Sequence, residues 1–243
     1  MHLLKYYVII YYDMSKFIII FIVIILILIF FLYRHGKTIA EHFTSNNMSN
    51  YAMETDEYIK PIILSDLISS DLCSKIINQS VNKLEESQIL EGKIKSIRNS
   101  SQHWINKNDP IIKHIYQKIS SMYNIPFENA EDMQVVRYLP NQYYNEHHDS
   151  CCDDNIKCDD FSKKSGQRIL TVLIYLNNEF TDGQTYFPKL KLKIKPKTGS
   201  AIVFYPLAMN SSKCHPLALH AGLPVSSGEK WIANLWFREK KYY

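Results

Sequence analysis

Hydrophobic residues follow three different patterns along this chain of 243 residues, and the first is an unbroken run near the N-terminus. Residues 17–33 (FIIIFIVIILILIFFLY) contain no charged side chain. A helix of this length would extend about 26 Å, close to the hydrocarbon thickness of a bilayer. The run is apolar on every side, and no small-residue cleavage site follows it. It therefore predicts an uncleaved transmembrane signal anchor rather than a buried core helix or a cleaved signal peptide.

The segments on either side of this run are polar. Residues 1–16 form a short N-terminal tail, and residues 34–60 lack clear periodicity, which is typical of a stalk. Lysine and arginine flank the run on both sides, so the positive-inside rule leaves its orientation open. Four Asn-X-Ser/Thr sequons would permit glycosylation of a lumenal domain, at Asn47, Asn78, Asn99 and Asn210.

From residue 61 the pattern becomes that of a folded domain. Residues 62–64 (IIL) are a candidate strand. Apolar positions then recur at helical spacing over residues 71–77, with Ser65 or Ser70 as the N-cap. They recur again after Asp109, which we expect at an N-cap with Pro110 at the first helical position. Both helices are expected to pack an apolar face on a sheet.

Beyond residue 133 the apolar spacing becomes that of strands. Turn signals such as Asp182-Gly183 and Ser227-Gly228 separate the segments. The predicted strands cover residues 133–139, 142–149, 168–176, 184–187, 190–194, 200–205, 217–221 and 230–237. Helices followed by many short strands predict an α+β domain over residues 61–243, preceded by one transmembrane helix. Its core, about 133–239, is expected to be a double-stranded β-helix, or jelly roll, with N-terminal supporting helices.

Composition narrows the classes of partner and the redox environment. The net charge is only +4 and the lysines are scattered, so no nucleic-acid partner is predicted. Five cysteines are too few for a disulfide-built scaffold, but they suit one or two bridges in an oxidising compartment, with at least one thiol left over. A polar insertion carries Cys151, Cys152 and Cys158. It could be a disulfide-tied lid or a zinc clip, and an oxidising compartment favours the disulfide.

The candidate chemistry begins with His147 and Asp149. Side chains alternate faces along a strand, so these two point the same way. Taken alone, His-X-Asp is a common chance pattern. A second histidine from a distant strand would complete the two-histidine, one-carboxylate set that holds non-haem Fe(II). His220 lies in an apolar strand and is the favoured partner, whereas His215 is expected to be a solvated loop residue. His148 points to the opposite face, where it would have a supporting or structural role.

Lys230 opens the last predicted strand, ten residues after His220. A buried lysine is costly without a partner. Its position therefore indicates an anionic co-substrate beside the metal, and the alternative is a solvent-facing residue at a strand end.

In order along the chain, these segments resemble the prolyl 4-hydroxylases of the Fe(II)/2-oxoglutarate dioxygenase superfamily, in a short, membrane-anchored form. The resemblance covers about residues 62–239. The matching segments are Asp71-Leu72-Cys73, Ser96-Ile97-Arg98-Asn99-Ser100, Gln134-Val135-Val136-Arg137-Tyr138, Tyr144-X-X-His147-X-Asp149, Arg168-Ile169-Leu170-Thr171, Asp182-Gly183-Gln184-Thr185-Tyr186-Phe187-Pro188, His220-Ala221-Gly222 and Gly228-Glu229-Lys230-Trp231. As an ordered set they are far more specific than the isolated His-X-Asp.

The resemblance implies a site and a reaction. His147, Asp149 and His220 would bind Fe(II). Lys230 would pair with the distal carboxylate of 2-oxoglutarate, assisted by Tyr138 and Thr185. A proline of a peptide or collagen-like protein would be 4-hydroxylated with O2, releasing succinate and CO2, while L-ascorbate rescues oxidised iron. Trp236 would wall the pocket or serve as a core tryptophan.

Two alternatives to this activity stay open. One is a dioxygenase of the same superfamily that acts on a lysyl side chain, another protein or a small molecule. The other is a non-catalytic, membrane-anchored binding protein on the same fold.

The sequence also departs from the family. Asp182 and Gln184 replace Gly and Glu of the usual motif, Leu223 stands where animal collagen hydroxylases have Cys, and the cysteine insertion has no family counterpart that we can place. We expect a single-pass membrane protein with its catalytic domain in the endoplasmic reticulum lumen, or in a virion or host membrane if the source is viral. Oligomeric state is left open.

Overall fold

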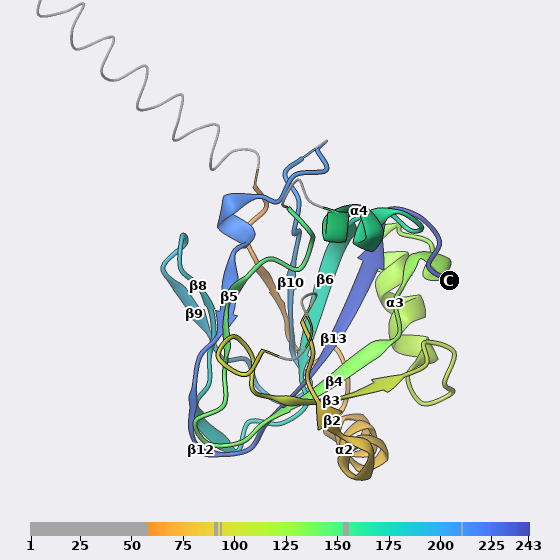
Figure 1. Ribbon diagram of the computed structural model, residues 1–243. Helices are drawn as coiled ribbons and strands as arrows, with labels where there is room; N and C mark the ends of the chain where they lie inside the picture. The colour runs from red at the N-terminus through yellow and green to blue at the C-terminus, as the bar shows by residue number, and fades with distance from the viewer. Residues whose placement is uncertain (1–57, 90–91, 93, 153–155, 210) are drawn as a thin grey trace, which may run out of the picture. The chain divides into compact units, whose positions relative to one another are not determined.

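The folded domain is described by a computed structural model that covers residues 58–89, 92, 94–152, 156–209 and 211–243 (Figure 1). The predicted tail, the predicted anchor at residues 17–33 and nearly all of the stalk lie outside these residues. Within the part of the chain that is described, no helix is both long enough and apolar enough to span a bilayer.

Two antiparallel sheets form the domain, as the strand pattern predicted. The larger has the order β1-β10-β6-β13-β4-β3-β2 and the smaller β5-β11-β8-β9, while β12 and β7 form a separate ribbon. The larger sheet comprises Ile62–Leu64, Ala201–Phe204, Arg168–Tyr175, Lys230–Arg238, Met133–Tyr138, Ser101–Ile105 and Glu85–Glu86, in that spatial order. The smaller comprises Tyr144–His147, His220–Gly222, Thr185–Phe187 and Leu192–Ile194, and the ribbon Val225–Gly228 with Phe180–Asp182.

Strand β13 shows how one sequence serves both faces of the larger sheet. Alternate side chains of a strand point to opposite faces. On one face, Trp231, Ala233, Leu235 and Phe237 join the apolar core beneath the helices. On the other, Lys230, Ile232, Asn234 and Trp236 line a cavity. The sheet therefore separates a wholly apolar core from a partly polar interior.

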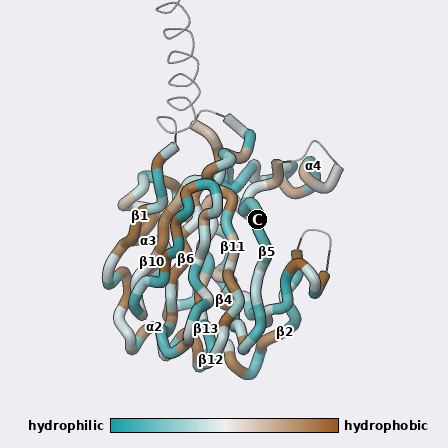
Figure 2. Tube along the Cα trace, turned by 90° about the vertical axis from the view of Figure 1, so that its left-hand side faces the viewer, coloured by the Kyte–Doolittle hydropathy of each residue, from teal (hydrophilic) through white to brown (hydrophobic). Residues whose placement is uncertain are grey.

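Helices α2 (Ser70–Ser80) and α3 (Lys113–Tyr123) supply the apolar core on the outer face of the larger sheet. From them, Cys73, Ile76, Ile115, Tyr116 and Ile119 are buried in the same cluster as the sheet residues. The two sheets differ in hydropathy: in Figure 2 the trace of β10, from the larger sheet, is hydrophobic, and that of β5, from the smaller sheet, is hydrophilic. A short helix, α4 (Ile156–Ser162), lies in the cysteine-bearing insertion, where no helix was predicted.

Helix starts differ from the predictions because of local capping. The N-cap of α2 is Ser69, whose hydroxyl accepts the Leu72 N–H at 3.3 Å, rather than Ser65 or Ser70. Helix α3 begins at Lys113 and not at Pro110. The Asp109 carboxylate accepts the N–H of Ile111 at 2.9 Å, which stabilises a turn before the helix.

The strand predictions were correct for the long strands and incomplete for the short ones. Strands β2, β3, β7 and β12 were not predicted; three of them have four residues or fewer and little apolar alternation. The segment predicted as a strand from residue 217 begins instead with a 3-10 turn, Pro216–Ala218, and becomes a strand only at His220. Pro216 occupies the first turn of this helix, where its fixed φ is suitable.

Candidate active site

A cavity of about 390 Å³ lies on the inner face of the larger sheet and contains the predicted site residues. Strands of both sheets contribute to its lining, so residues far apart in sequence meet there. His147, Asp149, His220, Lys230, Tyr138 and Thr185 all line it. The structure therefore brings together every residue that the sequence nominated for metal or co-substrate binding.

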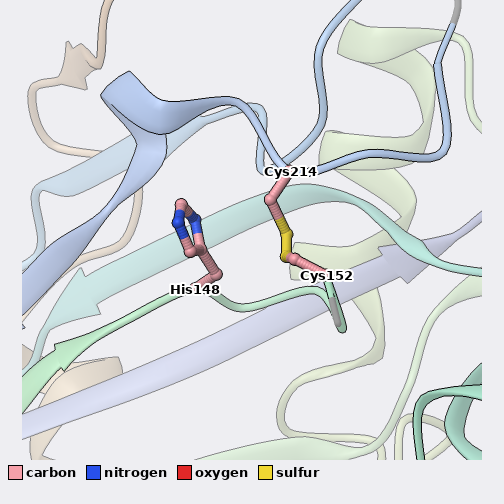
Figure 3. A group of neighbouring side chains, drawn as sticks. All are labelled: His148, Cys152 and Cys214. Atoms are coloured by element: carbon pink, nitrogen blue, oxygen red, sulfur yellow. A yellow bond between two sulfur atoms is a disulfide. The ribbon is translucent and has the colours of Figure 1, made fainter. Parts of the chain in front are cut away.

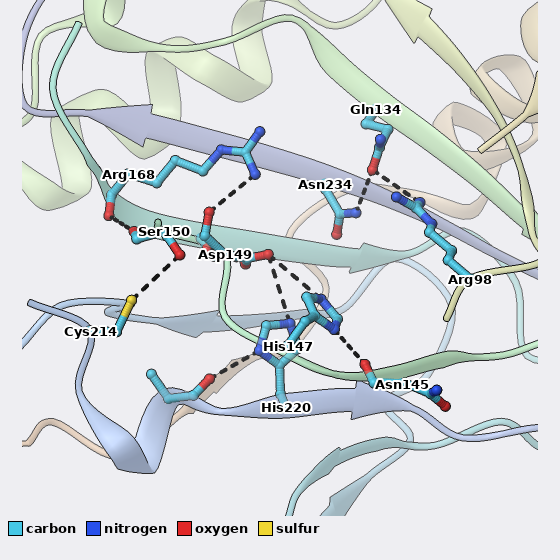
Figure 4. A network of polar contacts seen from close by, with 12 residues as sticks. Arg98, Gln134, Asn145, His147, Asp149, Ser150, Arg168, Cys214, His220 and Asn234 are labelled. Atoms are coloured by element: carbon cyan, nitrogen blue, oxygen red, sulfur yellow. Dashed lines mark hydrogen bonds and ion pairs between the residues drawn. The ribbon is translucent and has the colours of Figure 1, made fainter. Parts of the chain in front are cut away.

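His147, Asp149 and His220 converge at one end of this cavity (Figure 4). Strands β5 and β11 pair with His147 opposite His220. The Nε2 atoms of the two histidines each lie 3.9 Å from Asp149 Oδ1. The prediction that Asp149 belongs to the same strand as His147 was wrong, because β5 ends at His147 and Asp149 lies in the bend that follows. The two side chains nevertheless share one face.

Hydrogen bonds determine how the two imidazoles are presented. His147 Nδ1 lies 2.7 Å from the Asn145 carbonyl oxygen, and His220 Nδ1 lies 3.0 Å from that of Ala218. A carbonyl oxygen can only accept, so Nδ1 carries the proton in both rings. When such a ring is neutral, its lone pair is on Nε2, the atom that faces Asp149. This is the tautomer that a metal ligand requires.

The charges at the histidine end of the cavity favour the binding of a cation. Burial raises the pKa of Asp149, but His220, His147 and Arg168 together with the Thr171 hydrogen bond outweigh it and lower this pKa to about 2. Thr171 Oγ1 donates to Asp149 Oδ2 at 2.7 Å. Burial and the neighbouring His220 lower the pKa of His147 well below its usual value. Two imidazole nitrogens and one carboxylate are a donor set that fits Fe(II).

Lys230 lies in the same cavity with only 1% of its surface exposed. Its Nζ donates to the Gly183 carbonyl at 2.7 Å, and the rings of Tyr138 and Tyr175 lie 5.0 and 5.5 Å away. No carboxylate of the described residues forms an ion pair with it. Burial, with a smaller contribution from Lys195, lowers its pKa to about 7. A buried amine without a counter-ion indicates a site for an anion.

The distance between the two ends is set by strand β11. A methyl group on Gly222 would lie 3.8 Å from Lys230 Nζ and 3.6 Å from the Tyr138 hydroxyl. Gly222 is two residues beyond His220, and the pairing with β5 is irregular between them. Because two residues of chain span at most about 7 Å, the two positions are close in space. A small dianion could therefore contact the amine and still reach the histidine end.

The sequence did not predict a role for Tyr175, which positions Thr185. Its hydroxyl lies 2.7 Å from Thr185 Oγ1, accepts the Thr185 N–H at 3.2 Å and donates to the Ile194 carbonyl at 3.2 Å. Thr171 was also missed as the partner of Asp149. Both residues carry hydroxyl groups and face inward from strand β6, which is apolar between Ile169 and Ile174 except at Thr171. Hydroxyl-bearing residues at two positions four apart on one face of this strand are the signal that could have identified them.

A cluster of aromatic and charged side chains forms another part of the cavity wall. Trp236 is 4% exposed and lines the cavity, so it walls the pocket. The guanidinium carbon of Arg168 lies 3.6 Å from the centre of its indole ring. Arg168 also makes two hydrogen bonds to the buried Glu131, of 2.7 and 2.8 Å, and donates to the Asp149 carbonyl at 3.3 Å.

The prediction for His215 was wrong, because this residue is buried. It was expected to be solvated but is only 4% exposed. Its Nδ1 accepts the Leu217 N–H at 3.1 Å, because it caps the 3-10 turn, and its ring stacks on Tyr58 with centroids 4.5 Å apart.

The cysteines of the insertion are paired, as predicted, but with one unexpected partner. Disulfides join Cys151 to Cys158 and Cys152 to Cys214, while Cys73 is a buried free thiol. The sequence did not predict Cys214 as a partner. Cys151 and Phe161, from the insertion, line the cavity, which agrees with its interpretation as a lid.

Comparison with known proteins places this geometry among related chains. The family model described as the 2OG-Fe(II) oxygenase superfamily matches residues 133–238. A protein of Acanthamoeba polyphaga mimivirus that carries the provisional name prolyl 4-hydroxylase is 63% identical over 193 residues, which are 79% of this chain and 80% of that protein. Prolyl 4-hydroxylase 1 of Arabidopsis thaliana is 33% identical, over 74% of this chain and 69% of its own.

A solved structure is similar as well. The viral collagen prolyl hydroxylase of Paramecium bursaria Chlorella virus-1, crystallised with 2OG, is 34% identical with a TM-score of 0.60. The match covers 74% of this chain and 96% of that one.

Proposed function

This chain belongs to the prolyl 4-hydroxylase family of the 2OG-Fe(II) oxygenases, and on that premise we propose that it hydroxylates proline residues of a peptide substrate at C4. The observation that carries the proposal is one cavity that holds a cation-binding set at one end and, at the other, a buried amine with no counter-ion among the described residues. These are the complements of Fe(II) and of the carboxylate of 2-oxoglutarate.

We assign His147, Asp149 and His220 as the Fe(II) ligands. Each offers one ligand atom, and these atoms lie within 4.8 Å of one another; Asp149 Oδ1 is 3.9 Å from both Nε2 atoms. When bound, Fe(II) would supply O2 activation for hydroxylation of the substrate, coupled to the oxidative decarboxylation of 2-oxoglutarate to succinate and CO2. The backbone carbonyls that hold both Nδ1 protons, and Thr171 on Asp149, keep these donors oriented.

Lys230 is the proposed partner of the distal carboxylate of 2-oxoglutarate. The bound dianion would raise the pKa of this amine and hold it protonated. Tyr138, which is buried beside Gly222, and Thr185, held by Tyr175, would provide hydroxyl groups to the same carboxylate. This end binds and orients the co-substrate and does not take part in proton transfer.

The peptide substrate would bind on the side of the cavity lined by Trp236, Arg168 and the insertion. The relatives are named as prolyl or collagen prolyl hydroxylases, which favours a peptidyl-proline or collagen-like substrate. A different substrate, such as a lysyl side chain, is the alternative that the assay below distinguishes.

Residues 17–33 are proposed as the membrane anchor, followed by a stalk and a lumenal catalytic domain. The predicted stalk, 34–60, ends earlier than expected, because Tyr58 is buried and belongs to the domain. Of the sequons, Asn78 is exposed on α2, whereas the Asn99 side chain accepts the Tyr143 N–H at 2.7 Å and is a poor glycosylation site. Resistance of the full chain to alkaline extraction from membranes would support the anchor, and its release would contradict it. Ascorbate is the proposed reductant for iron oxidised in unproductive turnover.

The activity is tested by incubating the full chain with Fe(II), 2-oxoglutarate, ascorbate and proline-rich or collagen-like peptides. We expect succinate in step with a single added oxygen on proline, located at C4 by comparison with standards. Peptides with proline replaced by alanine, or with lysine as the only candidate, are the controls. Oxygen added to lysine would favour a lysyl side chain as the substrate instead of proline. No succinate with any peptide would contradict the proposed activity.

A further inference from the structure

Next to the proposed iron site, a second group of metal-ligating side chains comes together. His148, Cys152 and Cys214 offer one imidazole nitrogen and two sulfurs, all within 4.8 Å of one another (Figure 3). In this structure the two cysteines are joined as a disulfide. We propose that reduction of this disulfide opens a second metal site, in which His148 and the two thiolates bind Zn²⁺.

The ligand types select the ion. Thiolate sulfur with imidazole nitrogen is a donor set that suits Zn²⁺, whereas the iron site has only nitrogen and oxygen donors. Zinc bonds of about 2.3 Å to sulfur and 2.0–2.1 Å to nitrogen place tetrahedral ligand atoms roughly 3.4–3.8 Å apart. The cysteine Cα atoms are 5.4 Å apart, so side-chain rotations can make this adjustment. Three protein ligands leave one position for water.

The chemistry balances with an ordinary dithiol as the reductant. The dithiol gives two electrons and two protons to the Cys152–Cys214 disulfide and is itself oxidised to a disulfide. Zn²⁺ then displaces the two thiol protons, which leave to solvent. Both sulfurs lie near the Ser150 carbonyl oxygen, at 3.1 Å for Cys152 and 3.4 Å for Cys214. The reduced thiols therefore have an acceptor for their S–H groups.

The exposure of its cysteines and the nearby histidine favour the Cys152–Cys214 pair over the Cys151–Cys158 pair as the metal site. Cys152 is exposed and Cys214 half-buried, so a reductant and an ion can reach them. Cys158 of the other disulfide is 5% exposed. Within the described residues, no third ligand joins Cys151 and Cys158 in a cluster of this kind. That pair is a matched internal control.

Binding at this site would connect to the iron site through the chain. His148 lies between His147 and Asp149 in sequence, and Cys214 is six residues before His220. An ion held by these residues would fix both segments that carry the proposed iron ligands.

The test uses Co²⁺ as a spectroscopic substitute for Zn²⁺ in the full chain. After reduction under argon and removal of the dithiol, we expect Co²⁺ to produce a thiolate-to-cobalt charge-transfer band, which Zn²⁺ abolishes by displacement. The oxidised protein should lack the band, since Co²⁺ at the iron site has no sulfur ligand.

The variants assign the band. His148→Ala keeps the disulfide intact, and it should weaken Co²⁺ binding by more than the roughly 10–100-fold that loss of a supporting group costs. The pair Cys151→Ser with Cys158→Ser should leave the band unchanged. Absence of the band in reduced protein, or a band lost only with Cys151 and Cys158, would overturn the proposal. So would a band insensitive to His148→Ala.

Discussion

The two ends of the cavity solve opposite electrostatic problems. At one end, Asp149 is compensated by two imidazoles and by Arg168, and its pKa is lowered to about 2. At the other, Lys230 has no carboxylate partner among the described residues, and burial lowers its pKa to about 7. The first end is nearly complete and needs a cation to join its donors. The second is destabilised as it stands and needs an anion. A folded chain can thus carry a prepared site and a strained one in the same cavity.

Removal of a histidine should have the largest effect, because it eliminates a ligand. We expect His220→Ala or His147→Ala to reduce turnover by at least about 10³-fold, roughly 4 kcal/mol in the activation barrier. Iron binding, measured by anaerobic titration, should fall with it. His114→Ala is the matched control, since His114 is exposed on α3. Activity retained in either variant would show that the ligand is misassigned.

The Lys230→Met variant should bind 2-oxoglutarate more weakly and yet be more stable without it. Loss of a charge-assisted hydrogen bond of about 1.5–3 kcal/mol predicts a KM for 2-oxoglutarate raised roughly 10–150-fold. The same change removes a buried amine, so the protein without co-substrate should become more stable to urea. Lys193→Met, at an exposed position on β9, should change neither quantity. A less stable variant would contradict the description of this end as strained.

The pH dependence tests the charge of Lys230 directly. Its pKa is about 7 in the folded protein against 10.5 for a free lysine, so between these values the unfolded chain binds more protons. Stability of the co-substrate-free protein should therefore rise with pH across that window. Affinity for 2-oxoglutarate should fall as pH rises above 7, because the amine loses its charge. Both trends should disappear in Lys230→Met.

Tyr175→Phe should have the smallest effect. It removes one hydroxyl that positions Thr185, and the loss of a neutral hydrogen bond costs about 0.5–1.5 kcal/mol. We expect a KM for 2-oxoglutarate raised roughly 2–12-fold with little change in kcat. Tyr186→Phe is the control, because Tyr186 is adjacent to Thr185 and points to the other face of β8. Equal effects in the two variants would exclude a specific role.

The residues nominated from the sequence lie in one cavity, because their chemistry stands out among the apolar segments of the chain. His147 ends β5, His220 and Lys230 begin β11 and β13, and Asp149 lies in the bend after β5, so each stands at or beside the end of a strand. His215 was mispredicted because capping of a 3-10 turn and stacking on Tyr58 depend on contacts that periodicity does not encode. The partner of Cys152 was missed for the same reason, since a separation of 62 residues carries no local signal. Strand β7 (FTD) was missed because it has one apolar residue, Phe180, whereas the equally short β1 (IIL) is apolar throughout.

The Cys152–Cys214 bridge also affects the unfolded chain. Joining residues 62 apart limits the conformations that an unfolded chain can adopt, worth about 4 kcal/mol in the loop-closure description, whereas the 7-residue bridge between Cys151 and Cys158 is worth about 2 kcal/mol. Reduction would return most of this conformational entropy. An ion held by His148, Cys152 and Cys214 would restrict the same loop again, so the domain could keep its cross-link whether its surroundings are oxidising or reducing.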